Sequence, residues 1–417
     1  MVQLSDDCFA HGGRLMRTTE ALALLEKRLS RVTQDETLPL RAALGRILTE
    51  DVLAAQDVPP SDNAAVDGYA IYFDDLNAES ETVLPVAGRA AAGHPMREPA
   101  QRGAAVRIFT GAVVPPGPDT IVMQEDCQLR GTQVVIPPGL RRGANHRAAG
   151  EDLRAGDRAL ARGQRLRPQD LGLAAAVGRK TLRVSQVLKV ALFSTGDELA
   201  EPGGPLPSGA IYDSNRFTLM GLLEGLGCRV SDLGILPDKG PEVTEALREA
   251  ARGHEAIITS GGVSVGEEDH VKTAVETLGS LYAWRLAIKP GRPLALGQVA
   301  QVPFLGLPGN PVAVVITFLI LARPALLRLM GARDLLPHRF KVTAGFDYRK
   351  KKERREWVRV TLTPLEDGGW RAERFPREGS GILSSLVAAD GLVELPEDLT
   401  GLSTGAMVDF LPFSEVL

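Results

Sequence analysis

The sequence predicts a multidomain protein of the α/β-plus-β class. We expect a central, doubly wound and mostly parallel α/β domain, a β-rich insert and a C-terminal β domain resembling a barrel. A chain of 417 residues is too long for one ordinary hydrophobic core, so we expect two to four domains. Strand and helix patterns alternate between residues 189 and about 336. Short apolar runs broken by glycine and proline lie on both sides of that segment.

The composition indicates a soluble, cytoplasmic protein. Apolar residues make up 44% of the chain and charged residues 24%, as in ordinary globular domains. The net charge of −4 gives no basic field, so we expect no nucleic-acid partner. The longest apolar run, residues 312–322, is shorter than the roughly 20 residues of a membrane span and predicts a buried helix. Residues 1–13 resemble a frayed tail rather than a signal peptide, and the three widely spaced cysteines predict neither disulfides nor a zinc site.

Periodicity predicts the elements in order. Leucine spacing predicts helices over residues 18–29 and 40–53, and a short helix begins at Pro168. Residues 56 to about 146 predict an all-β insert. In the central segment we expect strands at residues 190–194, 229–236 and 256–260 and near residues 286, 294 and 304. We expect helices over residues 214–226 (capped by Ser214-Asn215 and closed by Gly227), 241–252 and 269–278, and a long helix from Asn310-Pro311. C-terminal strands are expected at residues 341–346, 356–363, 391–395 and 407–411.

Acidic residues follow three successive strands of the predicted sheet. Glu198, Asp238 and Asp269 each come at or shortly after a carboxyl end. Open parallel sheets bind their ligands at these ends, and carboxylate oxygens suit a Mg²⁺ ion that bridges to a phosphate. The sequence therefore predicts a Mg²⁺ site there, although each acid alone could be a helix cap or a solvated side chain.

A glycine-rich turn and several basic residues predict an anion site at the same edge. The turn Ser260-Gly261-Gly262-Val263-Ser264 would offer bare backbone N–H groups to a phosphate. It matches neither the Walker pattern nor GxGxxG, so neither ATP hydrolysis nor dinucleotide binding is predicted. Arg285 and Lys289 lie four residues apart on what we take to be one strand, so both would point to one face. With Arg292 they would bind an oxyanion.

Other motifs leave alternatives open. Asp67-Gly68 in the insert could carry function or form a plain β-turn, and Thr110-Gly111-Ala112 could be a plain loop. The basic run at residues 349–355 could be a solvated hairpin tip. The scattered histidines form no Ser-His-Asp, Cys-His or HExxH arrangement, which argues against nucleophilic and zinc hydrolytic chemistry.

Nine motifs follow one another along the chain: DGYA (67–70), IFTGA (108–112), GED (150–152), FSTGDE (193–198), IYDSNR (211–216), SGGVSVG (260–266), IKPGRP (288–293), GLPGNP (306–311) and GSGILSS (379–385). Together they resemble the molybdopterin molybdenumtransferase family, which includes the bacterial MoeA proteins and the E domain of gephyrin. The glycine-rich turn is also similar to that of the molybdopterin adenylyltransferases, whose single domain resembles residues 188–331. The flanking β regions favour the molybdenumtransferase. Arg285 departs from the pattern, because the family usually has a lysine there.

The resemblance implies a homodimer of elongated, four-domain subunits. The expected parts are a disordered tail (1–13), a discontinuous helical and extended dimerisation domain (14–55 and 148–187), the β insert (56–147), the α/β molybdopterin-binding domain (188–333) and the C-terminal β domain (334–417). The active site would lie between the α/β domain of one subunit and the insert of the other.

The resemblance also implies the reaction. Adenylylated molybdopterin would bind first. With molybdate and Mg²⁺, its phosphoanhydride would be cleaved as molybdenum is placed on the dithiolene, with release of AMP. An upstream adenylyltransferase would supply this substrate, and apo-molybdoenzymes would receive the product. The rival functions are molybdopterin adenylyltransferase and a non-catalytic, gephyrin-like scaffold.

Site residues are carried over position by position. The expected catalytic residues are Asp67, Thr110, Asp152, Asp238 and Asp269. The expected metal ligands are Glu198, Asp238 and Asp269. The expected substrate-binding residues are Ser260, Gly261, Gly262, Ser264, Arg285, Lys289, Arg292, Pro308, Arg359 and Ser380. Arg359 and Ser380 come from the resemblance alone.

Overall fold

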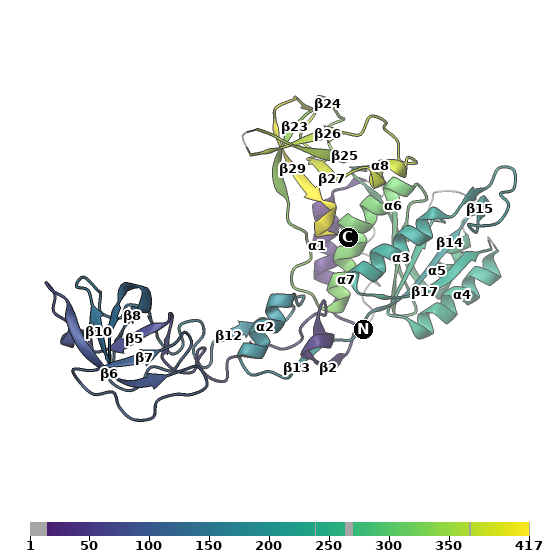
Figure 1. Ribbon diagram of the computed structural model, residues 1–417. Helices are drawn as coiled ribbons and strands as arrows, with labels where there is room; N and C mark the ends of the chain where they lie inside the picture. Colours follow the sequence, from purple (N-terminus) through teal and green to yellow (C-terminus); the bar gives the residue numbers. More distant parts are fainter. Residues whose placement is uncertain (1–14, 238, 263–269, 367, 417) are drawn as a thin grey trace.

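The computed structural model describes residues 15–237, 239–262, 270–366 and 368–416. Figure 1 shows a β-rich part that projects far from a larger body, which consists of a sheet covered by helices and a C-terminal barrel. The predicted α/β-plus-β class is confirmed. The exact domain limits stay a prediction.

The central sheet has seven strands in the order β1-β19-β21-β22-β18-β14-β17. Their bounds are β1 Leu15–Met16, β14 Lys189–Thr195, β17 Arg229–Leu236, β18 Ala256–Ser260, β19 Gly279–Leu286, β21 Pro293–Val299 and β22 Val302–Leu307. Four strands, β22, β18, β14 and β17, run parallel, and so do β1 and β19. The β19–β21 and β21–β22 pairs are antiparallel. The sheet is therefore mostly parallel, as predicted.

Helices cover both faces of this sheet because its strands are apolar on both sides. Helices α1 (Thr18–Arg28) and α3 (Ser214–Leu226) contribute to one core, and α4 (Gly240–Gly253) and α5 (His270–Leu278) contribute to the other. Along β14, Leu192 lies in the first core and Phe193 in the second.

Helix α3 has the expected closing glycine but a different cap. Gly227 adopts φ +92°, as a left-handed helix end requires. The predicted Ser214-Asn215 cap is wrong, since the carboxylate of Asp213 accepts the backbone N–H of Arg216 instead. The side chain of Asn215 is left to make contacts at the site described below.

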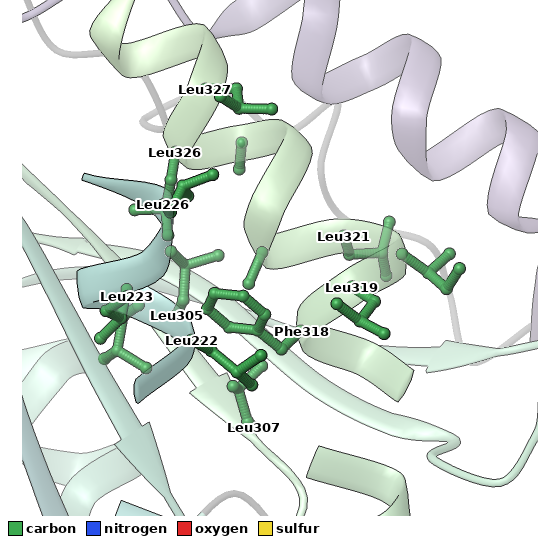
Figure 2. Packing of buried hydrophobic residues seen from close by; sticks show 14 of the residues in the cluster. Leu222, Leu223, Leu226, Leu305, Leu307, Phe318, Leu319, Leu321, Leu326 and Leu327 are labelled. Atoms are coloured by element: carbon green, nitrogen blue, oxygen red, sulfur yellow. The ribbon is translucent and has the colours of Figure 1, made fainter. Parts of the chain in front are cut away.

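The longest helical segment, Pro311–Met330, forms the centre of the first core. It comprises α6 (Pro311–Thr317), a π turn (Phe318–Ala322) and α7 (Arg323–Met330). This segment is long and apolar enough to cross a membrane, but 94% of its apolar window is buried inside the protein. Figure 2 shows Phe318 packed among leucines of α3 and β22. The apolar run thus forms the buried helix that the sequence predicts.

The insert is built on a six-stranded sheet in the order β8-β5-β7-β6-β10-β9. The bounds are β5 Gly68–Ile71, β6 Thr82–Ala90, β7 Ala105–Ile108, β8 Thr120–Met123, β9 Gln128–Arg130 and β10 Gln133–Ile136. A separate hydrophobic core lies on each of its faces. The predicted all-β texture of this region is confirmed. Strands β4 (Asn63–Ala64) and β11 (His146–Arg147) pair with each other and so join the beginning and the end of the insert.

Short elements join the insert to the body. They are β2 Asp35–Pro39 paired with β13 Thr181–Ser185, β3 Val52–Leu53 paired with β12 Arg158–Leu160, and α2 Pro168–Ala176. The predicted helix over residues 40–53 is wrong, since only the turn Leu40–Ala43 is helical, in 3-10 form. Gly45 adopts φ +74°, and its N–H donates to the carbonyl of Leu166 at 2.8 Å. Pairing with this distant segment therefore overrides the leucine spacing.

The C-terminal part is a closed barrel of five strands. Strands β25, β26, β23, β29 and β27 follow one another, and β27 pairs back with β25. Their bounds are β23 Phe340–Ala344, β25 Arg355–Pro364, β26 Trp370–Arg374, β27 Gly391–Leu395 and β29 Met407–Pro412. A two-residue strand from the α/β part, β20 (Ile288–Lys289), adds to β25. Smaller elements are β15 Leu199–Ala200, β16 Ile211–Tyr212, β24 Tyr348–Arg349, β28 Gly401–Leu402 and α8 Ser384–Val387.

The core around Phe318 yields a stability prediction. Phe318 is 1% exposed, and Phe318→Ala should lower the free energy of unfolding. We expect a loss of about 3–5 kcal/mol, because the truncation leaves a cavity that the neighbouring leucines only partly fill. Urea unfolding followed by circular dichroism measures it. Val387→Ala is the control: Val387 is 84% exposed, and its truncation should matter little. Equal effects of the two substitutions would contradict the assignment of this core.

Candidate functional site

A cavity of about 540 Å³ lies where the α/β part meets the barrel. Its walls come from residues 288–292, from β24 to β26, and from the segment 375–380. Four residues that the sequence analysis assigned to the anion site line it: Lys289, Arg292, Arg359 and Ser380. The structure thus brings together residues that lie up to 91 positions apart in the sequence.

Backbone pairing between the two parts positions these side chains. Lys289 pairs with Glu356 where β20 adds to β25. The backbone N–H of Val312, in the first turn of α6, donates to the carbonyl of Ser380 at 2.9 Å. These contacts fix both sides of the cavity relative to the long core helix.

Arg359 is the most deeply buried cation of the cavity. It is 8% exposed, and its Nε has no hydrogen-bond partner among the described residues. Its Nη2 donates to the carbonyls of Arg377 and Gly379 at 3.4 and 3.3 Å. Burial lowers the pKa of Arg359, and the negative charge of Glu378 offsets part of this effect. A buried guanidinium with a free donor is suited to accept an anion.

Lys289 belongs to a network around the buried carboxylate of Glu356. The ammonium of Lys289 donates to the Tyr348 hydroxyl at 3.3 Å and lies 3.6 Å from Glu356 Oε2. The Tyr348 hydroxyl donates to Glu356 at 2.9 Å, and Arg354 donates to the other carboxylate oxygen at 2.6 Å. Burial, together with the hydrogen bond to Glu356, raises the pKa of Tyr348. The hydroxyl therefore stays protonated and holds its place between the two charges.

The prediction that Arg285 and Lys289 share one strand face is wrong. Arg285 belongs to β19 of the central sheet, whereas Lys289 belongs to β20, which pairs with the barrel. Between them the chain changes sheets: the N–H of Ala287 donates to Met16, and its carbonyl accepts from Arg355. Arg285 is exposed and does not line the cavity, so its substrate-binding role stays a prediction.

The glycine-rich turn lies at the carboxyl end of β18. Asn215 donates to Ser260 Oγ at 2.9 Å and to the carbonyl of Gly309 at 2.7 Å. Ser260 Oγ donates to the carbonyl of Pro308 at 3.4 Å. These contacts join the start of α3 to the ends of β18 and β22. The Ser260 hydroxyl therefore has protein partners, and its binding role stays a prediction, as does that of Pro308.

Two glycines of this turn are required by their surroundings. Gly261 and Gly262 have φ of +90° and +62°. A Cβ on Gly262 would lie 2.5 Å from Thr195 Oγ1, and one on Gly261 would lie 2.7 Å from the Thr195 carbonyl oxygen. Two buried hydroxyls near the glycine-rich turn, those of Thr195 and Thr259, have no hydrogen-bond partner among the described residues.

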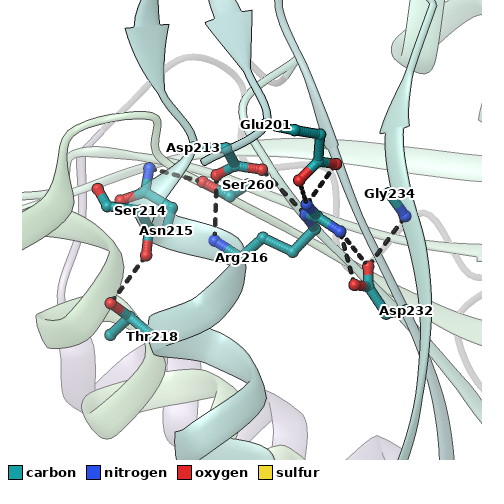
Figure 3. A network of polar contacts seen from close by, with 9 residues as sticks. All are labelled: Glu201, Asp213, Ser214, Asn215, Arg216, Thr218, Asp232, Gly234 and Ser260. Carbon is teal, nitrogen blue, oxygen red and sulfur yellow. Dashed lines mark hydrogen bonds and ion pairs between the residues drawn. The ribbon is translucent and has the colours of Figure 1, made fainter. Parts of the chain in front are cut away.

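Figure 3 shows the ionic cluster that stabilises the neighbouring loop. The buried guanidinium of Arg216 pairs with Asp213 at 3.1 Å, Asp232 at 2.6 Å and Glu201 at 2.5 Å. Burial alone would lower the pKa of Arg216, but the hydrogen bonds to Asp232 and Asp213 outweigh it and raise the pKa. Glu201 follows β15, Asp213 caps α3 and Asp232 lies on β17, so the cluster ties these elements together close to Glu198 in the sequence.

The proposed metal ligands are only partly described. Asp238, Asp269 and Ser264 lie outside the described residues. Glu198 is exposed, and its carboxylate occupies the space beside Gly196: a Cβ on Gly196 would lie 2.6 Å from Glu198 Oε2. Among the described residues, no group of three His, Cys, Asp or Glu side chains is placed to hold a metal ion. Glu198 carries carboxylate oxygens of the kind that Mg²⁺ prefers, and its role as a metal ligand stays a prediction.

In the insert, Asp67 and Thr110 meet as a pair. Asp67 Oδ1 accepts the backbone N–H of Thr110 at 2.8 Å and its hydroxyl at 2.7 Å. The backbone hydrogen bond, followed by that of the hydroxyl, lowers the pKa of Asp67. Asp152 is exposed near the base of the insert, where its N–H donates to the carbonyl of Val58. Asp67 and Thr110 adjoin β5 and β7, which belong to the part that projects away from the barrel in Figure 1.

Several cavity residues were missed by the sequence reasoning. They are Tyr348, Arg354, Glu356, Arg374 and Glu378. The basic run at residues 349–355 held a signal, since Arg354 at its end lines the cavity. The others occupy barrel strands and a loop whose contact with β20 no local pattern indicates.

Comparisons with known proteins cover nearly the whole chain. The family models for the MoeA N-terminal region (domains I and II), a probable molybdopterin binding domain and the MoeA C-terminal region (domain IV) match residues 16–178, 191–328 and 341–413. The chain is 38% identical over 405 residues to a molybdopterin molybdenumtransferase of Haemophilus influenzae, covering 97% of this chain and 100% of that protein. It is 33% identical to molybdopterin molybdenumtransferase 2 of Mycobacterium tuberculosis, covering 94% and 98%. A crystal structure of a molybdopterin biosynthesis MoeA protein from Pyrococcus horikoshii is 32% identical, with a TM-score of 0.81 and coverage of 95% and 99%.

The ionic cluster predicts a large cost for losing its cation. Arg216→Met should destabilise the α/β part by about 3 kcal/mol, because Asp213 would remain buried and uncompensated. Thermal unfolding followed by circular dichroism measures this. The control is Arg248→Met, which removes an exposed pair with Glu245 on α4 and should have little effect. If both variants unfolded at the temperature of the parent protein, the cluster would not stabilise the α/β part.

Proposed function

Since the chain belongs to the molybdopterin molybdenumtransferase family, we propose that it inserts molybdenum from molybdate into adenylylated molybdopterin and releases AMP. The protein is a transferase of molybdenum cofactor biosynthesis. The reaction would be the last step of that biosynthesis. An upstream adenylyltransferase would supply the substrate, and apo-molybdoenzymes in the cytoplasm would receive the product.

One observation supports molybdate binding above the others, namely the charge of the cavity. Six basic residues and two acidic residues line it, which leaves a surplus of four positive charges. A tetrahedral oxyanion with two negative charges would complete the hydrogen bonds of Arg359 and offset part of this surplus. Lys289 would act as a point charge beside it, and Arg359 as a directional donor.

The strand-end turn would bind the phosphate side of the other substrate. Its two left-handed glycines would let backbone N–H groups approach a phosphate, and the hydroxyl of Thr195 has no hydrogen-bond partner among the described residues. Mg²⁺ would be held by Glu198 together with Asp238 and Asp269, and when bound it would offset phosphate charge. The cluster around Arg216 keeps the Glu198 loop in place for this.

Asp67, Thr110 and Asp152 would act across a homodimer. Asp67 and Thr110 adjoin β5 and β7 of the insert, which projects away from the barrel of the same chain (Figure 1). A twofold dimer can place the insert of one subunit over the α/β part of the other. There the ionised Asp67, oriented by Thr110, would face the substrate from the opposite side.

The rival functions have less support. A molybdopterin adenylyltransferase would need only the α/β part, whereas the matches to MoeA regions extend over residues 16–178 and 341–413 as well. A non-catalytic scaffold would have no need of a buried Arg359 in a basic cavity with an Nε that has no hydrogen-bond partner among the described residues.

The reaction itself is the first test. The protein, adenylylated molybdopterin, Mg²⁺ and molybdate should together yield AMP and a product that reconstitutes an apo-molybdoenzyme. Removal of divalent ions with a chelator should abolish AMP release, and added Mg²⁺ should restore it. Incubation with ATP and molybdopterin should yield no adenylylated product. Formation of that product would favour the adenylyltransferase, and binding of adenylylated molybdopterin without turnover would favour the scaffold.

Subunit mixing tests the shared site. Asp67→Asn and Lys289→Ala should each be nearly inactive alone. After unfolding and refolding together, half of the dimers would be mixed and would carry one intact site, so about one quarter of wild-type activity should return. A mixture of Lys289→Ala with Arg359→Ala is the matched control and should stay inactive, because both substitutions affect the same side. No recovery in the first mixture would contradict a site shared between subunits.

A further inference from the structure

One carboxylate lies where the proposed oxyanion would be expected. Glu378 Oε2 is 3.7 Å from the ammonium of Lys289, and Glu378 Oε1 accepts from Arg374 at 3.0 Å. Its negative charge also acts on Arg359, the buried cation of the same cavity. Glu378 thus interacts with three of the cations that would bind an anion, and it lines the cavity itself.

The second acid of the cavity, Glu356, also lies beside Lys289, at 3.6 Å, but it differs in its burial and in its partners. The side chain of Glu356 is 1% exposed, and its two oxygens accept from Tyr348 and Arg354. It is a fixed part of the wall. The side chain of Glu378 is 55% exposed and follows β26 in the segment that leads to Ser380. An exposed ion pair is weak, so the Glu378 carboxylate can exchange its partners for water at little cost.

We propose that Glu378 is an internal competitor of the substrate oxyanion and sets the affinity of the cavity for molybdate. The carboxylate and the oxyanion require the same donors, chiefly the ammonium of Lys289. Two anions that share one ammonium repel each other strongly, so the carboxylate turns toward solvent when the oxyanion binds. This inference rests on the proposed function, since it takes molybdate as the ligand of the cavity.

The proposal predicts that removal of the Glu378 carboxylate increases the affinity for molybdate, whereas a purely structural role of Glu378 would predict a decrease. Replacement of a supporting residue weakens binding, whereas removal of a competitor strengthens it. Glu378→Gln and Glu378→Ala should therefore both bind molybdate about three- to tenfold more tightly than the parent protein at low ionic strength. The alanine variant excludes the explanation that a new amide donor causes the gain. The gain should shrink as salt is added, because repulsion between exposed charges is screened.

The matched control is Glu373→Gln on β26, the strand that precedes Glu378 in the sequence. Glu373 pairs with Arg371 at 2.6 Å and does not line the cavity, so its loss changes the net charge equally without removing a competitor. Equilibrium dialysis against molybdate, with molybdenum determined in both compartments, gives the dissociation constants. Sulfate, a tetrahedral dianion of similar shape, should show a gain of the same direction. In turnover, the KM for molybdate should fall in both Glu378 variants while kcat stays near that of the parent.

Each outcome decides the matter. Tighter binding in both Glu378 variants and none in the control supports the proposal. Unchanged or weaker binding by the Glu378 variants, with normal binding by the parent, overturns it and leaves the proposed function intact. If the folded parent, the control and the Glu378 variants all fail to bind molybdate and show no turnover, the proposed function fails and the inference fails with it.

Discussion

The pairing of β20 with β25 is the contact on which the site depends. Two residues of the α/β part, Ile288 and Lys289, form a parallel strand pair with the barrel, opposite Arg355 and Glu356. This short pairing places the α/β part and the barrel as the two walls of one cavity. Ligand sites commonly form at such junctions, because each part supplies groups that it could not assemble alone. The hydrogen bond from Val312 to Ser380 holds the opposite rim to the core helix.

The buried charged side chains are of two kinds: those whose hydrogen-bonding atoms all have protein partners, and those with an atom that has none among the described residues. Glu356 and Arg216 are buried with their partners in place, so they stabilise the wall and the loop that they join. Arg359 is buried with a donor unused. An unpaired buried donor carries a desolvation cost that a bound anion can remove. The same reasoning separates Glu356, which belongs to the wall, from the exposed Glu378, which competes for the cavity.

Local patterns predicted the strands and helices of the central sheet well, because a buried parallel sheet imposes apolar strands of regular length. Two local readings failed for one reason. The leucines of residues 40–53 suggested a helix, and Arg285 and Lys289 suggested a common strand face, yet in both places pairing with a distant segment decides the backbone. Lys289 and Arg292, which the sequence predicts as anion ligands, both line the cavity. Arg359 could not be found this way, since a basic residue in a barrel strand carries no local sign of its burial beside β20.

The central claim is that the cavity at the junction of the α/β part and the barrel, where β20 joins β25, binds molybdate. X-ray diffraction at the molybdenum absorption edge tests it most directly. Crystals equilibrated with molybdate should show an anomalous peak between Lys289, Arg359 and Ser380. A peak only at the glycine-rich turn of Ser260, or elsewhere on the surface, would contradict the account.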